Sequence, residues 1–441
     1  YGTPLLMGLS QGNRIADIPE GNNWIYSAEM QSDDWEWSQG HGYMIWNMYA
    51  SAGAHLSNKK IVSCEAMTNT KGVFKTSLDE LKQHDDMNFI SGINHSVLHG
   101  YNYSPQEVAF PGWLRFGTYF SEHNTWWPYI KKWTDYNARL SALFQQSNPI
   151  KKLAILGPEN SIWGKKGLVR KPIHLQPLYH HRLWESISQL GYSNDYINEK
   201  IIQNGQINNG ELQYGNMTYS LLVLASVKSI EPKTALALKA YVESGGQLVV
   251  VDQLPYNSVH FTDYEKNDEE VKQVMASIVE KHSNSIIKVD APNSNQSLLT
   301  WTSGLLSKTK VKPDVIIDKP VDFVYQIHQY TDNEIVYFFN NSHRFKTAEF
   351  NAIFPVKGKY PYLWNPETGE RKPYNYKDNP NNLNIELKPL ESLLLVFEAK
   401  EPLTNRSAKK SIRKELLVLN GTWDVEGKRV DGKVFNWKMD T

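Results

Sequence analysis

The side chains best suited to acid–base chemistry lie within or directly after short apolar runs near the start of the chain. The clearest case is the segment 61–69, Ile-Val-Ser-Cys-Glu-Ala-Met-Thr-Asn, in which Glu65 follows a strand-like apolar stretch. Parallel strands covered on both faces are apolar almost throughout, so a carboxylate at the carboxyl end of such a strand faces ligand-bearing loops. Glu65 is therefore a candidate general acid or base; the alternative is a Glu that pairs with an Arg or caps the next helix.

A second strand-like run, residues 88–103, ends in hydrogen-bonding and aromatic groups that include His99 and Tyr101. Between the two runs, residues 77–87 carry Leu and Met at helical spacing, with charged residues between them. The resulting order of strand, helix and strand is that of a βαβ unit in a parallel sheet or barrel. We therefore predict that His99 and Tyr101 contact a ligand at the loop face, with a buried, hydrogen-bonded histidine as the alternative for His99.

A third feature is the aromatic run 119–129, Tyr-Phe-Ser-Glu-His-Asn-Thr-Trp-Trp-Pro-Tyr, and eight of the 14 Trp residues fall at or before Trp133. Aromatic faces pack on the C–H faces of sugar rings, while interleaved polar side chains bind hydroxyls. The alternative is that these Trp residues pack the following helix onto the barrel. The substrate-binding residues predicted here, in addition to His99 and Tyr101, are Asn69, Trp113, Glu122, Asn124 and Trp126.

Composition excludes several classes of function. Basic and acidic residues both number 47, and this neutral balance argues against electrostatic binding of nucleic acid or of an anionic membrane. Cys64 is the only cysteine, which excludes an internal disulfide and a Cys-based zinc cluster; we interpret it as a small buried apolar residue and not a nucleophile. No apolar run approaches the roughly 20 residues of a transmembrane helix, so no membrane span is predicted.

Periodicity predicts an α/β chain with several parts. Residues 1–146 alternate strands and helices as in the C-terminal half of a (β/α)8 barrel. Residues 147–290 are predicted to form a separate, doubly wound α/β domain of flavodoxin or glutamine-amidotransferase type. Its Gly245–Gly246 pair ends a helix and does not begin one, as a dinucleotide-binding motif would, so no organic cofactor is predicted. Residues 291–400 change to period two and predict a β-sandwich, and 401–441 predict a linker and the start of a further β domain.

Four motifs taken together resemble glycoside hydrolase family 106, the α-L-rhamnosidases. They are Ala-Asp-Ile-Pro-Glu-Gly at 16–21, Lys-Lys-Ile-Val-Ser-Cys-Glu-Ala-Met-Thr at 59–68, His-Gly-Tyr at 99–101 and Asn-Thr-Trp-Trp at 124–127. The downstream α/β and sandwich patterns also follow the layout of that family, so the resemblance covers essentially the whole chain. It implies inverting hydrolysis of α-L-rhamnosidic bonds in plant or algal polysaccharide, by two carboxyl groups about 6.5 to 9.5 Å apart.

On this resemblance Glu65 and Glu20 are the catalytic residues present in the chain: Glu65 is the general base, and Glu20 binds substrate or a calcium ion. Glu20 and Glu65 are hard oxygen ligands of the kind calcium prefers, so both are also assigned as possible metal ligands. The family barrel has strands before residue 1, where the catalytic acid is expected. The chain is therefore predicted to be a fragment of a longer periplasmic or extracellular protein that carries half of the catalytic pair.

Two other functions stay open from the sequence. One is a non-catalytic carbohydrate-binding protein built on a degenerate barrel. The other is a β-galactosidase-like glycosidase, because a barrel followed by an α/β domain and a sandwich also describes some β-galactosidases. The motifs at 16–21 and 124–127 favour rhamnose, but they do not identify the linkage or the polymer.

Overall fold

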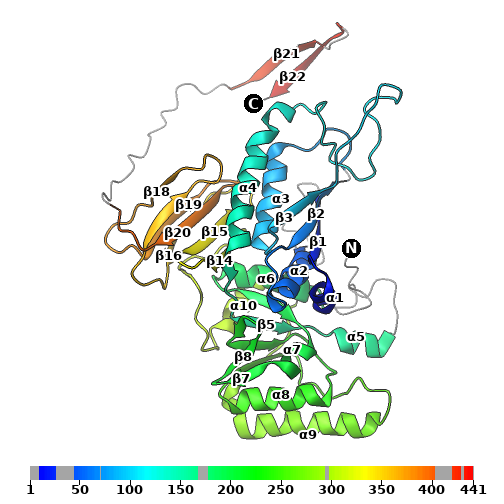
Figure 1. The fold of residues 1–441 in the computed structure, drawn as a ribbon, viewed down its shortest axis with the longest axis vertical. Helices are drawn as coiled ribbons and strands as arrows, with labels where there is room; N and C mark the ends of the chain where they lie inside the picture. Colours follow the sequence, from blue (N-terminus) through cyan, green and yellow to red (C-terminus); the bar gives the residue numbers. More distant parts are fainter. Residues whose placement is uncertain are drawn as a thin grey trace. The chain divides into compact units, whose positions relative to one another are not determined.

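The computed structural model describes residues 9–25, 44–69, 71–166, 177–293, 297–402, 420–428 and 432–440 (Figure 1). The chain divides into two compact units, residues 1–403 and residues 404–441. None of the described helices is long and apolar enough to cross a bilayer.

The first part of the larger unit alternates helices with parallel strands. Its elements are α1 (Leu9–Ile15), β1 (Glu20–Ile25), α2 (Ile45–Leu56), β2 (Ser63–Asn69), α3 (Leu78–Ile90), β3 (His95–Leu98), the 3-10 turn η3 (Trp127–Tyr129) and α4 (Ile130–Gln146). The strands form one parallel sheet in the order β1-β2-β3. This arrangement confirms a mixed α/β fold, while the half barrel stays a prediction.

Helix α3 has a strong start and stop signal in the sequence. Ser77 and Glu80 form a reciprocal capping box at its first turn. At its end Gly92 has a φ of 89°, and its N–H donates to the Phe89 carbonyl while the Ile93 N–H donates to the Asn88 carbonyl. The prediction of a strand from residue 88 is therefore wrong at its start, because Asn88–Ile90 complete the helix and the strand begins only at His95.

The second part is a five-stranded parallel sheet in the order β12-β11-β10-β5-β6, with the connectivity of flavodoxin-like folds. Its elements are β5 (Leu153–Leu156), α5 (Glu159–Lys166), α6 (Leu178–Gln189), β6 (Asn194–Ile197), α7 (Glu199–Asn204), β10 (Leu221–Leu224), α8 (Pro232–Glu243), β11 (Gln247–Val251), α9 (Tyr264–His282), η5 (Ser283–Ser285) and β12 (Ile286–Val289). A small antiparallel sheet of β7 (Gln206–Asn208), β8 (Glu211–Tyr214) and β9 (Met217–Tyr219) is inserted before β10.

The apolar runs of this sheet are explained by burial on both faces. Ile155 and Val223 pack in one core cluster with residues of α6, whereas their neighbours Ala154 and Leu222 pack in another with residues of α8 and α9. Gly245 has a φ of 103° and follows the end of α8, so it stops the helix as predicted.

The third part is a two-sheet β-sandwich, with helix α10 (Leu298–Leu306) before it and packed against α6. One sheet has the order β13-β16-β19 and the other β18-β17-β20-β15-β14-β4. The strands are β4 (Asn148–Pro149), β13 (Ile316–Ile317), β14 (Val324–Tyr330), β15 (Ile335–Asn341), β16 (Ala348–Ile353), β17 (Tyr360–Trp364), β18 (Arg371–Pro373), β19 (Asn382–Leu387) and β20 (Ser392–Glu398). Alternate residues of β16 and β19 are buried between the sheets, as period two requires.

A buried carboxylate fastens α3 to the sandwich. Asp86 accepts hydrogen bonds from the Tyr136 hydroxyl at 2.5 Å, the Asn340 amide at 2.9 Å and the Ser392 hydroxyl at 2.8 Å. Lys82 lies 2.8 Å from the same side chain and supplies the opposite charge. The first and third parts are therefore joined through a polar network as well as by apolar packing.

In the smaller unit, β21 (Thr422–Lys428) and β22 (Val434–Asp440) form an antiparallel hairpin, which agrees with the predicted start of a β segment. Residues 403–419, which hold most of the predicted linker, lie outside the described residues.

Candidate active site

A β-bulge in β2 places Glu65 and Thr68 on the same face of the parallel sheet. Asn22 of β1 pairs with Glu65 of β2, and Trp24 pairs with Thr68. Two residues of β1 therefore correspond to three residues of β2. Met67 takes up the extra residue with a φ of 67°. Side chains three apart on a regular strand point to opposite faces, so only the bulge lets the Thr68 hydroxyl donate to Glu65 Oε1 at 2.7 Å.

Glu65 is the third of the seven residues of β2 and its side chain is 13% exposed. The prediction that it ends its strand is wrong, because the strand continues through the bulge to Asn69. Its neighbour in β2, Cys64, is fully buried, as predicted, and burial raises the pKa of its thiol. Glu65 itself lies on the face of the sheet opposite to Cys64.

His99 gives the Glu65 carboxylate a second partner. Its Nε2 lies 2.7 Å from the carbonyl oxygen of Arg115, which can only accept, so Nε2 carries a hydrogen. Its Nδ1 lies 3.3 Å from Glu65 Oε1. A favourable contact at this distance requires a proton on one of these two atoms. Glu65 Oε1 therefore has two polar neighbours, the donating Thr68 hydroxyl and the His99 imidazole.

Glu20 lies on the same face as Glu65 but nearer the amino end of the sheet. It is the first residue of β1, stands opposite Ser63, and accepts a hydrogen bond from the Ser63 hydroxyl at 3.0 Å. Glu65 follows Ser63 by two residues, so its side chain points the same way. From a rise of about 3.3 Å per residue and a strand spacing of about 4.8 Å, the Cα atoms of Glu20 and Glu65 are about 8 Å apart.

Tyr101 and Glu122 meet at the carboxyl end of the sheet, beside the bridge that joins Tyr101 to Phe120. The Tyr101 hydroxyl donates to Glu122 Oε2 at 2.8 Å, and this bond raises the pKa of Tyr101 above its usual value. The backbone N–H of Glu122 and the same hydroxyl lower the pKa of the Glu122 carboxyl. The Tyr101 ring packs edge-on against Trp127 at 6.5 Å, so an aromatic surface adjoins the carboxylate.

Trp113 is 77% exposed on the loop between β3 and η3, as a sugar-stacking residue would need to be. The same loop exposes Tyr103, Phe110 and Phe116, which the motifs did not single out. The available signal was the number of large apolar residues in a segment, 103–118, that also holds prolines and glycines and carries no helical or strand period.

Asn69, Asn124 and Trp126 are buried and hold the loops together. Asn69 donates to the Thr118 hydroxyl at 3.4 Å, the Asn124 amide donates to the Tyr119 carbonyl at 3.3 Å, and the Trp126 indole donates to the Thr76 carbonyl at 2.7 Å. Direct contact of these three with a ligand stays a prediction. The contacts present in the structure position the loops that carry the exposed aromatic residues.

The predicted calcium site has two carboxylates from this chain, Glu20 and Glu65. Calcium takes six to eight oxygen ligands. Within the described ranges, no three His, Cys, Asp or Glu side chains are grouped so that they could hold a metal ion. The calcium ion therefore stays a prediction, and we route no chemical step through it.

A family model for glycoside hydrolase family 106, described as alpha-L-rhamnosidase, matches residues 7–378. The match includes all of β1, β2 and β3, the α/β sheet and most of the sandwich. The chain belongs to this family. The family 106 assignment confirms the resemblance drawn from the four motifs and places the chain among the glycoside hydrolases, whose substrates are carbohydrates.

Individual proteins are similar to this chain over most of its length. A protein of Formosa agariphila named "Putative beta-glucuronidase" is 28% identical over 375 residues, which are 82% of this chain and 29% of that protein. A rhamnosidase structure from Novosphingobium sp. PP1Y has a TM-score of 0.69 at 22% identity, covering 97% of this chain and 39% of that one. A β-galactosidase from Rahnella sp. R3 has a TM-score of 0.57 at 12% identity, with 88% and 61% covered.

These structural likenesses are too remote in sequence to show more than a shared fold. The chain spans less than a third of the Formosa protein and about two fifths of the Novosphingobium rhamnosidase. The β-galactosidase shares the fold of this chain, whereas the family model assigns the chain to glycoside hydrolase family 106.

Proposed function

We propose that this chain forms part of the catalytic unit of an α-L-rhamnosidase that cleaves plant or algal polysaccharide with inversion at the anomeric carbon. The observation that carries the proposal is the Glu65 carboxylate, held by Thr68 and His99 on one face of the parallel sheet, with exposed aromatic side chains on the loops beyond. We call the longer protein, of which this chain is predicted to be a fragment, the parent protein. A polymeric substrate of this kind also fits a periplasmic or extracellular location of the parent protein.

Glu65 acts as the general base in the proposed reaction. It takes a proton from water while the water oxygen bonds to the anomeric carbon; the glycosidic C–O bond breaks on the opposite side, and a carboxylic acid protonates the leaving oxygen. Thr68 and His99 fix the orientation of the Glu65 carboxylate before attack. Exposed rings such as Trp113 would pack against sugar rings of the polymer.

Glu20 is the one other carboxylate on this face among the described residues of β1, β2 and β3. It either binds a substrate hydroxyl or supplies the acid, and the alternative source of the acid is a part of the parent protein outside these strands. The two roles of Glu20 can be separated with substrates whose leaving group needs no protonation, because cleavage of such substrates does not depend on a general acid. If Glu20 is the acid, Glu20→Gln should lose turnover of a 4-nitrophenyl rhamnoside far more than of a 2,4-dinitrophenyl rhamnoside.

The central experiment follows rhamnose release from an aryl α-L-rhamnoside by the parent protein, with NMR detection of the anomer formed first. We expect β-L-rhamnose first, and we expect Glu65→Gln to lower kcat by a factor of about 10³ or more while sugar affinity is largely kept. Glu349→Gln, which changes an exposed carboxylate on β16, should leave both kcat and the affinity for sugar unchanged.

Full turnover in the Glu65→Gln variant would refute the role assigned to Glu65, and α-L-rhamnose as the first product would refute inversion. A parent protein that binds glycans and cleaves none would instead support the carbohydrate-binding alternative.

A further inference from the structure

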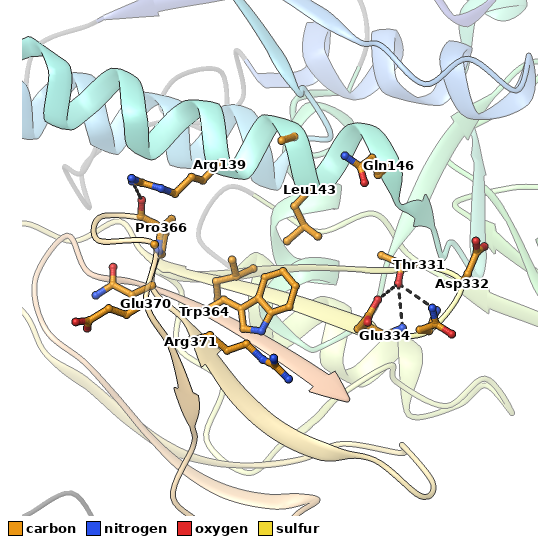
Figure 2. Close-up of a pocket in the computed structure, with 15 residues that line it drawn as sticks. Arg139, Leu143, Gln146, Thr331, Asp332, Glu334, Trp364, Pro366, Glu370 and Arg371 are labelled. Atoms are coloured by element: carbon orange, nitrogen blue, oxygen red, sulfur yellow. Dashed lines mark hydrogen bonds between the residues drawn. The ribbon is translucent and has the colours of Figure 1, made fainter. Parts of the chain in front are cut away.

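A separate cleft of about 630 Å³ lies between α4 and the six-stranded sheet (Figure 2). Its wall on α4 includes Arg139, Ala142 and Leu143, and its opposite wall is built from the β14–β15 turn, β17 and the β17–β18 turn. Leu143 lies about 20 Å along α4 from Ile130, where the helix leaves the loops of the rhamnosidase site. The cleft has the size of a small-molecule site, and no residue of the proposed mechanism lines it.

The floor of the cleft presents a flat aromatic surface. Figure 2 shows the Trp364 ring between Leu143 of α4 and Arg371 of β18. The indole N–H donates to Glu398 Oε1 at 2.9 Å, so the polar edge of the ring is already bonded. An indole fixed at its edge leaves its apolar face as the surface on which a ligand can pack.

The charges around the ring disfavour an anion. Arg371 donates to the Glu398 carboxylate at 2.6 Å, and Arg139 donates to the Pro366 carbonyl at 2.7 Å, so both guanidinium groups already have partners within the protein. Three further carboxylates, those of Asp332, Glu334 and Glu370, line the cleft and oppose an anion.

We infer that this cleft binds a neutral saccharide. A sugar ring offers an apolar C–H face to Trp364, and its hydroxyls can donate to the carboxylates and the Gln146 amide that line the cleft. The inference rests on the residues of the cleft alone and does not depend on the proposed hydrolysis. In the folded protein the cleft serves as a second glycan-contact site, outside the face that carries Glu65.

The test measures affinity by titration calorimetry on the parent protein, with L-rhamnose, D-galactose, a β-1,4-galactan tetrasaccharide and xylotetraose as neutral probes, and with D-galacturonate and choline as charged ones. Ala142 is exposed on α4 and lines the cleft, so Ala142→Trp should fill it and weaken binding at least tenfold. Ala138→Trp, at an exposed alanine one turn earlier that does not line the cleft, is the matched control and should bind as wild type.

A second pair of variants tests the aromatic surface. Trp364→Leu should lose about tenfold in affinity, while Trp364→Phe, which keeps a ring, should lose less than about threefold. Glu65→Gln should keep this binding whatever its effect on hydrolysis. The inference is overturned if no neutral probe binds with a Kd below about 10 mM, if Ala142→Trp binds as wild type, or if a charged probe binds more tightly than every neutral one.

Discussion

Replacing Asp86 by Ala should destabilise the larger unit strongly, because this carboxylate is fully buried and joins α3 to α4, β15 and β20. Removing it leaves the Asn340 amide without its acceptor, at a cost of about 1–3 kcal/mol for a buried donor. Lost charge-assisted bonds from the Tyr136 and Ser392 hydroxyls add about 1–2 kcal/mol, because these two groups stay 3.0 Å apart and partly satisfy each other. Lys82 is 22% exposed and can turn to water, so its lost partner adds little.

The expected loss is about 2–5 kcal/mol in the free energy of unfolding. Urea unfolding followed by tryptophan fluorescence measures it, with the slope m checked for constancy. Asp86→Asn keeps an acceptor and should cost less. Asp79→Ala, at an exposed position on the same helix, should change stability by less than about 1 kcal/mol. A loss below about 1 kcal/mol in Asp86→Ala would refute the view that this network holds the two parts together.

Three further changes have defined outcomes. Burial raises the pKa of the Asp85 carboxyl from 3.8 to about 7, so the folded chain keeps this proton to higher pH than the unfolded chain. The contribution of Asp85 to the free energy of unfolding is full below pH 3.8 and is lost as the pH rises toward 7. Gly92→Ala should cost about 2–3 kcal/mol, because φ is 89° and the new Cβ would lie 2.7 Å from Ser51 Cβ. Thr68→Val should lower kcat of the parent about tenfold or more with little change in KM, because Glu65 loses a donor.

Each of these has a direct check. Melting temperatures of wild type and Asp85→Asn should diverge between pH 4 and pH 8 if Asp85 titrates as described, and parallel curves would contradict it. Gly72→Ala, where φ is 98° and no atom lies closer than 3.9 Å, isolates the backbone cost and should be milder than Gly92→Ala. Thr68→Ser should restore most of the turnover lost in Thr68→Val; if it does not, the hydroxyl is not what Glu65 needs.

Local patterns predicted much of the fold because they report local physics. The fully apolar runs 153–156 and 248–251 lie in strands buried on both faces, and Gly245 ends the helix before the second strand. The start of β3 was misplaced because Asn88–Ile90 suit a helix or a strand equally well by composition. The signal that decides it is Gly92 as a left-handed stop, and it lies beyond the apolar residues.

The candidate site was predicted only in its residue types. Glu65 was placed at a strand end because periodicity cannot show a bulge, and without the bulge at Met67 nothing relates Glu65 to Thr68. The contact between Glu65 and His99 depends on the register of two parallel strands, which their separation in sequence does not fix. Burial of Asn124 is likewise a tertiary property, set by how its loop turns back on residue 119.

The short strand β4 has a consequence for anyone who divides this chain into pieces for expression. Asn148 and Pro149 follow α4 directly, yet they pair with Tyr330 and Gln329 at the edge of a sheet formed almost entirely by residues after 320. A cut just after residue 149 would therefore strip an edge strand from the downstream product and leave Asp86 without Asn340 in the upstream one. Soluble pieces are better sought by cutting near residue 403, where the boundary between the compact units falls.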